Sequence, residues 1–258
     1  MTSDLSAIQA HTSDTRQIFV RLTPERADTV RVLALPQAGA GCATFAECAA
    51  KLAPDVGLWA LNLPGRQARF TEPPVTNLNT LIPDIATGIQ AVADTPYVLF
   101  GYCLGSLLSF LAVRKALASE APPPRALVVA SCPAPQLVRP ARKIHTLPSD
   151  RFWSAVFSWG GFSNTLADQP DHREIFEPAL RADFELFAAF RYVGGPPFSM
   201  PIVALAGRDD PDCTLAELSP WAEHTTTRFT AELLNGDHWL LGGALDEVIA
   251  ILDRECRR

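Results

Sequence analysis

The stretch VLFGYCLGSLLSFL, at residues 98–111, joins an apolar run, a cysteine flanked by glycines and a leucine-rich run. The apolar run Val98–Phe100 is typical of a buried strand. The leucines of residues 104–111 recur at helical spacing, which predicts a helix that begins at once. Gly101 and Gly105, on either side of Cys103, would let that strand and that helix approach closely. The stretch therefore predicts a strand, a sharp turn and a helix.

The rest of the chain repeats this alternation of β-rich and helical runs almost from end to end. The expected strands are Ile18–Leu22, Val30–Leu35, Gly57–Leu63, Tyr97–Gly101, Ala126–Ser131, Ile202–Ala206 and Arg228–Leu234. The expected helices are Thr44–Leu52, Leu78–Ala93, Leu104–Ser119, Leu215–Ala222 and Leu245–Arg254. Such alternation is typical of an α/β fold with a mostly parallel sheet flanked by helices. A chain of 258 residues can form one large core, so we expect a single domain over residues 1–258.

The alternation breaks between Pro133 and Pro201, where helical patterns occur without a convincing strand. We interpret this region as an insertion at about residues 140–195. Within it, apolar side chains at three- and four-residue steps predict one helix over residues 173–192, with a continuous and mostly aromatic face: Phe176, Leu180, Phe184, Phe187 and Phe190. That face either packs in the core or belongs to a helical lid that lines a substrate pocket.

Composition restricts the classes of function. The formal net charge of -6 leaves no basic surplus for a nucleic-acid partner. No apolar run reaches the ~18 residues of a membrane span, and residues 1–17 lack the pattern of a secretion signal, so we expect a cytoplasmic protein without a membrane partner. The six cysteines form no CxxC pair, and no cysteines and histidines cluster, which favours reduced thiols and predicts no metal site and no cofactor.

Cys103 is the candidate nucleophile. In a GxSxG turn between a strand and a helix, the central residue exposes its reactive atom in a strained conformation. Here the central residue is a cysteine, whose thiolate is a strong nucleophile and is favoured by a helix N-terminus or a nearby protonated histidine. The position of this turn indicates covalent catalysis by a thiol.

Such a nucleophile needs an acid and a histidine base, usually in the chain order nucleophile, acid, histidine. Only His238 follows the last expected strand, so it is the candidate base, and His224, at a helix end, is the weaker alternative. The acid should follow the strand that ends at Ala206, where Asp209 and Asp210 compete. We favour Asp210 as the acid that orients the imidazole, and Asp209 is the alternative acid or a turn residue.

An oxyanion hole requires two backbone N–H donors, one after the nucleophile and one from a loop that follows an early strand. Leu104 would supply the first donor. We assign the second to Ala38, in the small-residue loop LPQAGAG at residues 35–41, whose backbone can come close to a substrate. The alternative is a plain glycine-rich turn, since the spacing does not fit a phosphate-binding GxxxxGK motif.

Together these motifs resemble the type II thioesterases, the discrete editing enzymes of bacterial polyketide and nonribosomal peptide assembly lines. The likeness covers the chain from about Val32 to Gly242. It rests on LPQAG at 35–39, LPGRQ at 63–67, FGYCLG at 100–105, LRADFE at 180–185, GRDDP at 207–211 and GDH at 236–238. Arg66, within LPGRQ, is left without an assigned role.

The resemblance implies an α/β-hydrolase fold with a small helical lid, and release of acyl or aminoacyl groups from the phosphopantetheine arm of an acyl or peptidyl carrier protein. It places the nucleophile on Cys103, the acid on Asp210 and the base on His238, with the oxyanion donors on Ala38 and Leu104. The sequence departs from the family at the turn, where the usual pattern resembles GHSMG. Only the cysteine alters the chemistry.

The cysteine leaves the fate of the acyl group open. We expect thioester hydrolysis first, and transfer to a second acceptor as the alternative, because a Cys103 thioester keeps its acyl group activated. A cyclase is disfavoured, since no carboxylate follows Cys132 closely. A non-catalytic module that only binds carrier proteins is disfavoured by the presence of a nucleophile, an acid and a histidine in the expected order.

Overall fold

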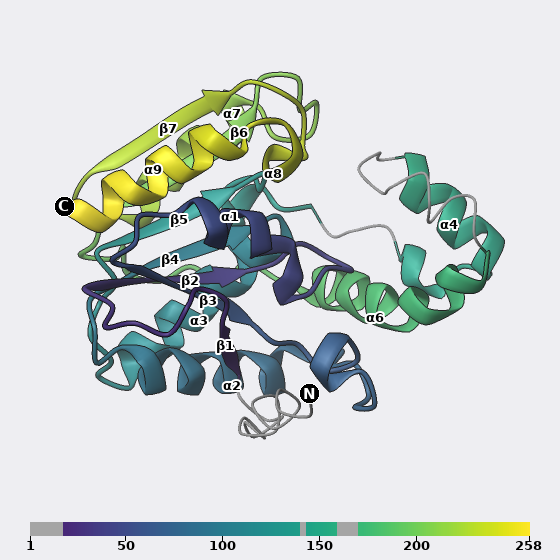
Figure 1. Cartoon of the computed structure of the whole chain (residues 1–258). Coiled ribbons are helices and arrows are strands. Elements are labelled where there is room, and N and C mark those ends of the chain that lie inside the picture. The colour runs from purple at the N-terminus through teal and green to yellow at the C-terminus, as the bar shows by residue number, and fades with distance from the viewer. Residues whose placement is uncertain (1–17, 140–142, 159–169) are drawn as a thin grey trace, which may run out of the picture.

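A seven-stranded sheet forms the centre of the protein (Figure 1). The computed structural model describes residues 18–139, 143–158 and 170–258, with the backbone alone at 170–172. The strands pair in the order β1-β3-β2-β4-β5-β6-β7, and every pair is parallel except β1 with β3. They span β1 Phe19–Arg21, β2 Val30–Leu35, β3 Val56–Leu61, β4 Tyr97–Tyr102, β5 Ala126–Ala130, β6 Ile202–Gly207 and β7 Phe229–Leu234. The expected mostly parallel sheet is confirmed, and each expected strand is present.

Helices cover both faces of this sheet (Figure 1). The α-helices are α1 Ala46–Lys51, α2 Leu78–Val92, α3 Leu104–Ala118, α4 Ser149–Ser158, α6 Pro170–Ala189, α7 Leu215–Leu218, α8 Leu240–Gly243 and α9 Leu245–Arg257. Short 3-10 helices span Cys42–Phe45, Gln67–Arg69, Pro135–Leu137, Ile144–Thr146 and Ser219–His224. Successive side chains of a strand point to opposite faces, so Leu33 of β2 packs with α2 and α3, whereas Val32 packs with α1 and α9. Burial on both faces explains the nearly continuous apolar runs.

Helix ends follow local chemistry. The Asn77 side chain accepts a hydrogen bond from the Asn79 amide at 2.9 Å and caps α2. The helix expected over residues 215–222 is divided, because Pro220 has no amide hydrogen to donate, and a 3-10 helix follows α7. The helix expected over residues 173–192 is α6, which begins earlier, with Pro170 at its first position.

The segment between β5 and β6 carries α4 and α6, which project away from the sheet (Figure 1). Residues 140–142 and 159–169 of this expected insertion lie outside the described residues. The apolar face of α6 divides between two clusters. Leu180 and Phe184 pack with α4, whereas Phe187 packs with the cluster that contains α2 and α3. Phe176 is 43% exposed, so the face is not continuous in the core.

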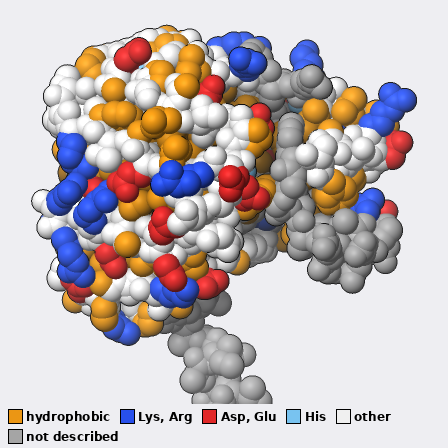
Figure 2. All heavy atoms as spheres, turned by 90° about the horizontal axis from the view of Figure 1, so that it is seen from above, with side chains coloured by type: hydrophobic (Ala, Val, Ile, Leu, Met, Phe, Trp, Pro, Cys, Tyr) orange, Lys and Arg blue, Asp and Glu red, His pale blue; other side chains and the backbone are white. Residues whose placement is uncertain are grey.

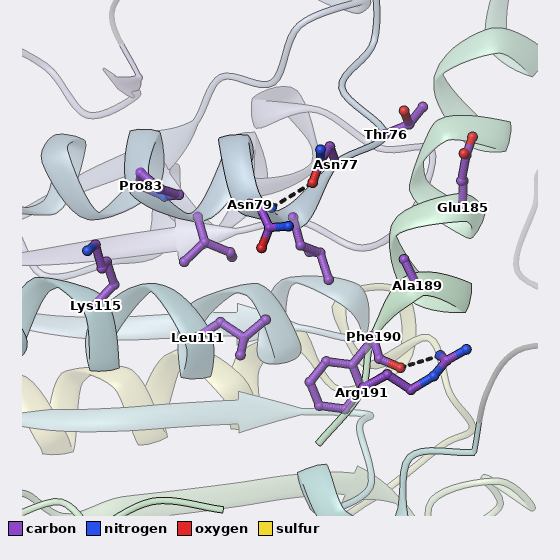
Figure 3. Close-up of a pocket in the computed structure, with 12 residues that line it drawn as sticks. Thr76, Asn77, Asn79, Pro83, Leu111, Lys115, Glu185, Ala189, Phe190 and Arg191 are labelled. Carbon is purple, nitrogen blue, oxygen red and sulfur yellow. Dashed lines mark hydrogen bonds between the residues drawn. The ribbon is translucent and has the colours of Figure 1, made fainter. Parts of the chain in front are cut away.

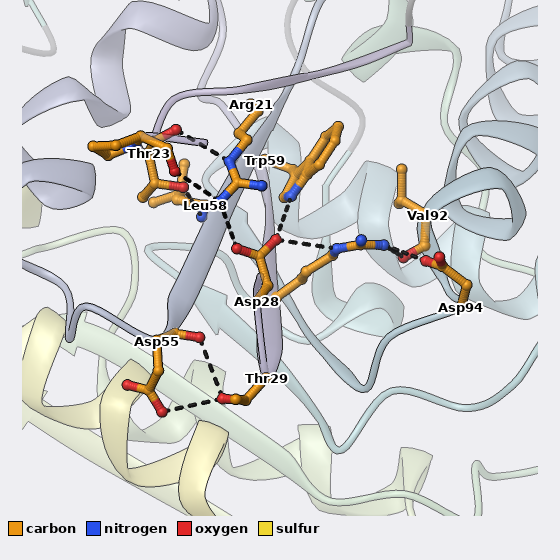
Figure 4. A network of polar contacts seen from close by, with 11 residues as sticks. Arg21, Thr23, Asp28, Thr29, Asp55, Leu58, Trp59, Val92 and Asp94 are labelled. Carbon is orange, nitrogen blue, oxygen red and sulfur yellow. Dashed lines mark hydrogen bonds and ion pairs between the residues drawn. The ribbon is translucent and has the colours of Figure 1, made fainter. Parts of the chain in front are cut away.

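A polar network holds the edge of the sheet where the strands begin (Figure 4). Asp28, which precedes β2, accepts hydrogen bonds from Arg21 at 2.6 Å, Arg31 at 3.3 Å and the Trp59 indole at 3.4 Å. Its side chain is 3% exposed, so these donors compensate a buried carboxylate. Gly57 gives it room, because a Cβ there would collide with the carboxylate. This network fixes β1, β2 and β3 far from the strand ends that carry the site.

Charged side chains of both signs are interspersed on the face that Figure 2 shows, with apolar patches between them. Within the described parts of the chain, no helix is both long enough and apolar enough to cross a membrane.

Candidate active site

The turn at Cys103 lies between β4 and α3, as expected. Cys103 has φ 51° and ψ -113°, a positive φ that residues other than glycine rarely adopt, and Leu104 begins α3 directly after it. The flanking glycines are required for space. A Cβ on Gly101 would collide with the backbone of Gly105, and a Cβ on Gly105 would collide with the backbone of Leu35. The strained turn is therefore held by close contact of β4, α3 and the end of β2.

The loop that contains Ala38 lies against the start of α3, because only the missing Cβ of Gly105 lets Leu35 and Pro36 approach it. Among the described residues, the Ala38 amide donates to no other group. The Leu104 amide is the first of α3 and precedes the helical hydrogen-bond ladder. Among the residues that the structure describes, both candidate amides are thus without a hydrogen-bond acceptor, and their role as oxyanion donors stays a prediction.

Asp210 and His238 meet because they follow the neighbouring parallel strands β6 and β7. Oδ2 of Asp210 lies 2.8 Å from Nδ1 of His238, and the Asp210 carboxylate also accepts from the Asp212 amide at 3.0 Å. Asp210 is 3% exposed. Asp209 is exposed and contributes its amide to the Gly236 carbonyl at 3.0 Å. The imidazole contact is therefore made by Asp210, the favoured of the two candidates.

The charge state of His238 is set by opposing effects. Burial lowers the pKa of the imidazole, but the hydrogen bond with Asp210 and the interaction with Cys103 raise that pKa to about 10. A protonated imidazole beside a cysteine favours the thiolate. His224 is different, since burial and the charge of Arg114 lower its pKa and its Nε2 bonds to Gln136 at 2.7 Å. The electrostatic environment favours His238 over His224 as the partner of a thiol.

Two hydroxyl groups without a sequence assignment hold the backbone of His238. Tyr102 Oη donates to the His238 carbonyl at 3.0 Å, and Ser131 Oγ donates to the same oxygen at 2.9 Å. Tyr102 is the last residue of β4, and Ser131 follows β5. The sheet therefore positions the loop of His238 directly. The position of Tyr102 beside the candidate nucleophile could have suggested a role in the site. The acceptor of its hydroxyl group, the His238 carbonyl, is remote in the sequence and could not be predicted.

Arg66 also gains a partner. Both terminal nitrogens of its guanidinium bond to the Asp183 carboxylate of α6, at 2.7 and 2.9 Å. Each residue lies in one of the shared motifs, LPGRQ and LRADFE. Their presence in two motifs of the same family resemblance was the only indication in the sequence that these residues could pair, because 117 positions separate them.

All six cysteines are free, and Cys103 differs from the others in its surroundings. Burial raises the thiol pKa at the five other positions: Cys42, Cys48, Cys132, Cys213 and Cys256. A raised pKa keeps a thiol protonated and weakly nucleophilic. Cys103 combines partial exposure with a neighbouring imidazole, that of His238, whose pKa is raised.

A cavity of about 700 Å³ lies apart from these residues (Figure 3). The start of α2, the middle of α3 and the end of α6 line it, with apolar contributions from Leu111 and Phe190. The Arg191 guanidinium donates a hydrogen bond to the carbonyl of the preceding residue, Phe190, with 2.6 Å between Nη1 and the oxygen. Neither Cys103 nor His238 is among the residues that line this cavity.

Comparisons with known proteins are consistent over nearly the whole chain. A thioesterase domain model matches residues 30–256. The chain is 30% identical over 250 residues to linear gramicidin dehydrogenase LgrE of Brevibacillus parabrevis. The aligned region covers 95% of this chain and 94% of that protein. It is 29% identical over 245 residues to gramicidin S biosynthesis protein GrsT of Aneurinibacillus migulanus, covering 95% of this chain and 96% of that protein.

The fold is shared with a solved structure. The type II thioesterase BorB, from the borrelidin biosynthetic cluster, superposes with a TM-score of 0.87 at 28% identity, over 96% of this chain and 100% of that chain. The expected α/β-hydrolase fold is thereby confirmed. Because the family model covers most of its length, the chain belongs to the thioesterase family.

Proposed function

We propose that this protein is a type II thioesterase that releases acyl or aminoacyl groups from the phosphopantetheine arm of a carrier protein, through an acyl-enzyme on Cys103. The observation that carries the proposal is the strained turn of Cys103 beside a His238 imidazole held 2.8 Å from Asp210. The names of GrsT and BorB, which refer to gramicidin S and borrelidin biosynthesis, support polyketide or nonribosomal peptide assembly as the setting.

The first half of the reaction transfers the acyl group to the enzyme. The Cys103 thiolate attacks the thioester carbonyl, and the negative charge that develops on the carbonyl oxygen is stabilised by the amides of Ala38 and Leu104. The bond to the phosphopantetheine sulfur breaks, and His238 donates its proton to that sulfur. Asp210 holds the imidazole in position and stabilises its charged form.

The second half regenerates the enzyme. His238, now neutral, accepts a proton from a water molecule as the water oxygen attacks the Cys103 thioester. The same two amides would stabilise the second oxyanion. Collapse of this intermediate releases the free acid and returns the thiolate and the protonated imidazole. A cysteine is suited to this cycle because exchange of one thioester for another requires little free energy.

The insertion at about residues 140–195 is proposed as a lid within a single domain of residues 1–258. The Ala38 side chain packs against the cluster of α4 and α6 as well as against the sheet, which supports a lid that adjoins the oxyanion loop. The comparisons do not favour acyl transfer, cyclisation or a binding-only role. Transfer is therefore retained as an outcome of the test below.

The test follows the mass of the intact enzyme after mixing with a carrier protein loaded with each of several acyl and aminoacyl groups. We expect a transient adduct on the wild type that decays into free acid, and none on Cys103→Ala. Cys132→Ala is the matched control, because it removes a buried thiol and leaves Cys103 in place.

Different outcomes separate the alternatives. An adduct that persists until an unloaded second carrier is added, and then moves to it, contradicts hydrolysis and indicates a transferase. Absence of both adduct and turnover across the acyl series contradicts catalysis by Cys103. Cys103→Ser distinguishes further, since a hydrolase should keep more of its activity with serine than a transferase does.

A further inference from the structure

Arg66 and Asp183 form a buried ion pair between the loop after β3 and helix α6. Arg66 is 7% exposed and Asp183 is 1% exposed. Their two parallel hydrogen bonds, at 2.7 and 2.9 Å, have the two-pronged geometry of strong guanidinium–carboxylate pairs. Removing both charges from water is unfavourable, so this pair is weak support for a role in stability alone.

Two further bonds of the pair reach the loop that carries Ala38, and a third joins Arg66 Nη2 to the Ala179 carbonyl of α6 at 3.5 Å. Oδ2 of Asp183 accepts the Gly39 amide at 2.7 Å, and Arg66 Nη1 donates to the Ala40 carbonyl at 2.8 Å. Leu180, one turn before Asp183, lies against Gly39, where a Cβ would be 2.6 Å from its Cδ1. The φ of +76° at Gly39 suits this close approach. The ion pair thus holds the two residues that directly follow Ala38, Gly39 through Asp183 of α6 and Ala40 through Arg66.

This contact determines which amide of the loop is available. The Gly39 N–H is engaged by Asp183, so it is not a donor for substrate, whereas the Ala38 N–H is unpaired among the described residues. Once the peptide unit between Ala38 and Gly39 is fixed, only the φ and ψ angles of Ala38 can still change the direction of the Ala38 N–H. The direction of that amide is therefore tied to the carboxylate of α6.

We propose that Asp183 and Arg66 are positioning residues for the oxyanion hole: through the Gly39 amide and the Ala40 carbonyl, they aim the Ala38 N–H at the reacting carbonyl. This inference rests on the proposed function, and gives α6 a part in the chemistry besides covering the site. The pair touches neither Cys103 nor His238. Loss of the pair should slow steps that create an oxyanion and spare steps that need only the thiolate.

Two reactions of the same thiol separate these effects. Alkylation of Cys103 by iodoacetamide requires the thiolate but forms no oxyanion, whereas acylation by an acyl-phosphopantetheine thioester requires both. The variants are Asp183→Asn and Arg66→Lys, which keep the approximate side-chain shape. Glu177→Gln is the matched control, because Glu177 is on the same helix and pairs with Arg181 at 2.6 Å, and its hydrogen bonds are to Ser149, Trp153 and Arg181.

In Asp183→Asn we expect acylation to slow about tenfold or more, less than the ~10²–10³-fold for removal of an oxyanion donor. Alkylation of Cys103, located by peptide mass, should stay within about twofold of wild type, and Glu177→Gln should leave both rates near wild type. Equal loss of both rates, or unchanged acylation, overturns the inference. If Asp183→Asn does not fold, Arg66→Lys is judged by the same two rates, and failure of both to fold overturns it. A wild type that is alkylated but never acylated contradicts the proposed function instead.

Discussion

The two halves of the site are fixed in different ways. Cys103, Asp210 and His238 follow β4, β6 and β7, and their loops are held by the sheet itself. Ala38 follows β2, but the next two residues of its loop are bonded to the ion pair of Asp183, on helix α6, and Arg66, in the loop after β3. The proposed nucleophile, acid and base are thus positioned by the hydrogen-bonded parallel strands, whereas the proposed oxyanion donor Ala38 is positioned through one ion pair. If the proposed role of the ion pair is right, the segment between β5 and β6 contributes to the site as well as the sheet does.

Among the residues held by the sheet, we expect substitution of Asp210 to lower kcat most. In Asp210→Asn the amide can hold the imidazole in the wrong tautomer and cannot stabilise its charge, so we expect kcat to fall by about 10²-fold or more. Asp209→Asn is the matched control, and should change kcat by less than about twofold because the Asp209 side chain is exposed. Steady-state kinetics with one thioester would measure both. A larger loss in Asp209→Asn would reverse the assignment of the acid.

The electrostatic link within this half can be sharpened by titration of His238. Burial lowers its pKa, but Asp210 and Cys103 raise it to about 10, so removing the thiol in Cys103→Ala should lower the pKa. The imidazole signals in a nuclear magnetic resonance pH titration would report the change. Since the folded value is raised, the contribution of His238 to stability is complete below about pH 6.5 and is lost as pH rises through about 10. An unchanged titration in Cys103→Ala would contradict a thiolate–imidazolium pair.

A smaller effect is expected where the sheet holds the His238 backbone. Tyr102→Phe removes one of two hydroxyl donors to the His238 carbonyl, and Ser131 remains bonded to it. We expect the free energy of unfolding to fall by about 1 kcal/mol, and kcat to fall no more than about fivefold. Denaturant unfolding and kinetics would measure both. The double variant with Ser131→Ala should lose more than the two single changes predict, because the carbonyl then has no hydroxyl donor.

The sequence sufficed for those parts of the molecule that depend on local pattern. Apolar runs and glycines predicted the strands and the turn at Cys103, and chain order selected His238, which the structure places against Asp210. The choice of Asp210 over Asp209 depended on a weak preference, since adjacent carboxylates differ only in how the turn directs them. The structure resolves their geometry, with Asp210 buried against the imidazole and Asp209 exposed.

The sequence could not predict polar contacts between residues that are far apart in the chain. Nothing local in Arg66 specifies a partner on α6, because an arginine in a loop is usually solvated and its partner lies 117 positions away. The same holds for Tyr102, whose acceptor is a backbone carbonyl and leaves no mark on the side-chain pattern. The division of α6 between two clusters likewise depends on how the helix lies across the molecule, which its periodicity does not encode.

The parallel sheet has a practical consequence for engineering the protein. Because β2, β4, β5, β6 and β7 all run in one direction, the loops that enter these strands lie at the edge opposite Cys103. Pro123, in the connector between α3 and β5, is exposed at that edge. New chain termini or a fused reporter at Pro123 would leave the edge that carries Cys103 unobstructed, so the proposed carrier protein could still approach a circularly permuted or labelled form.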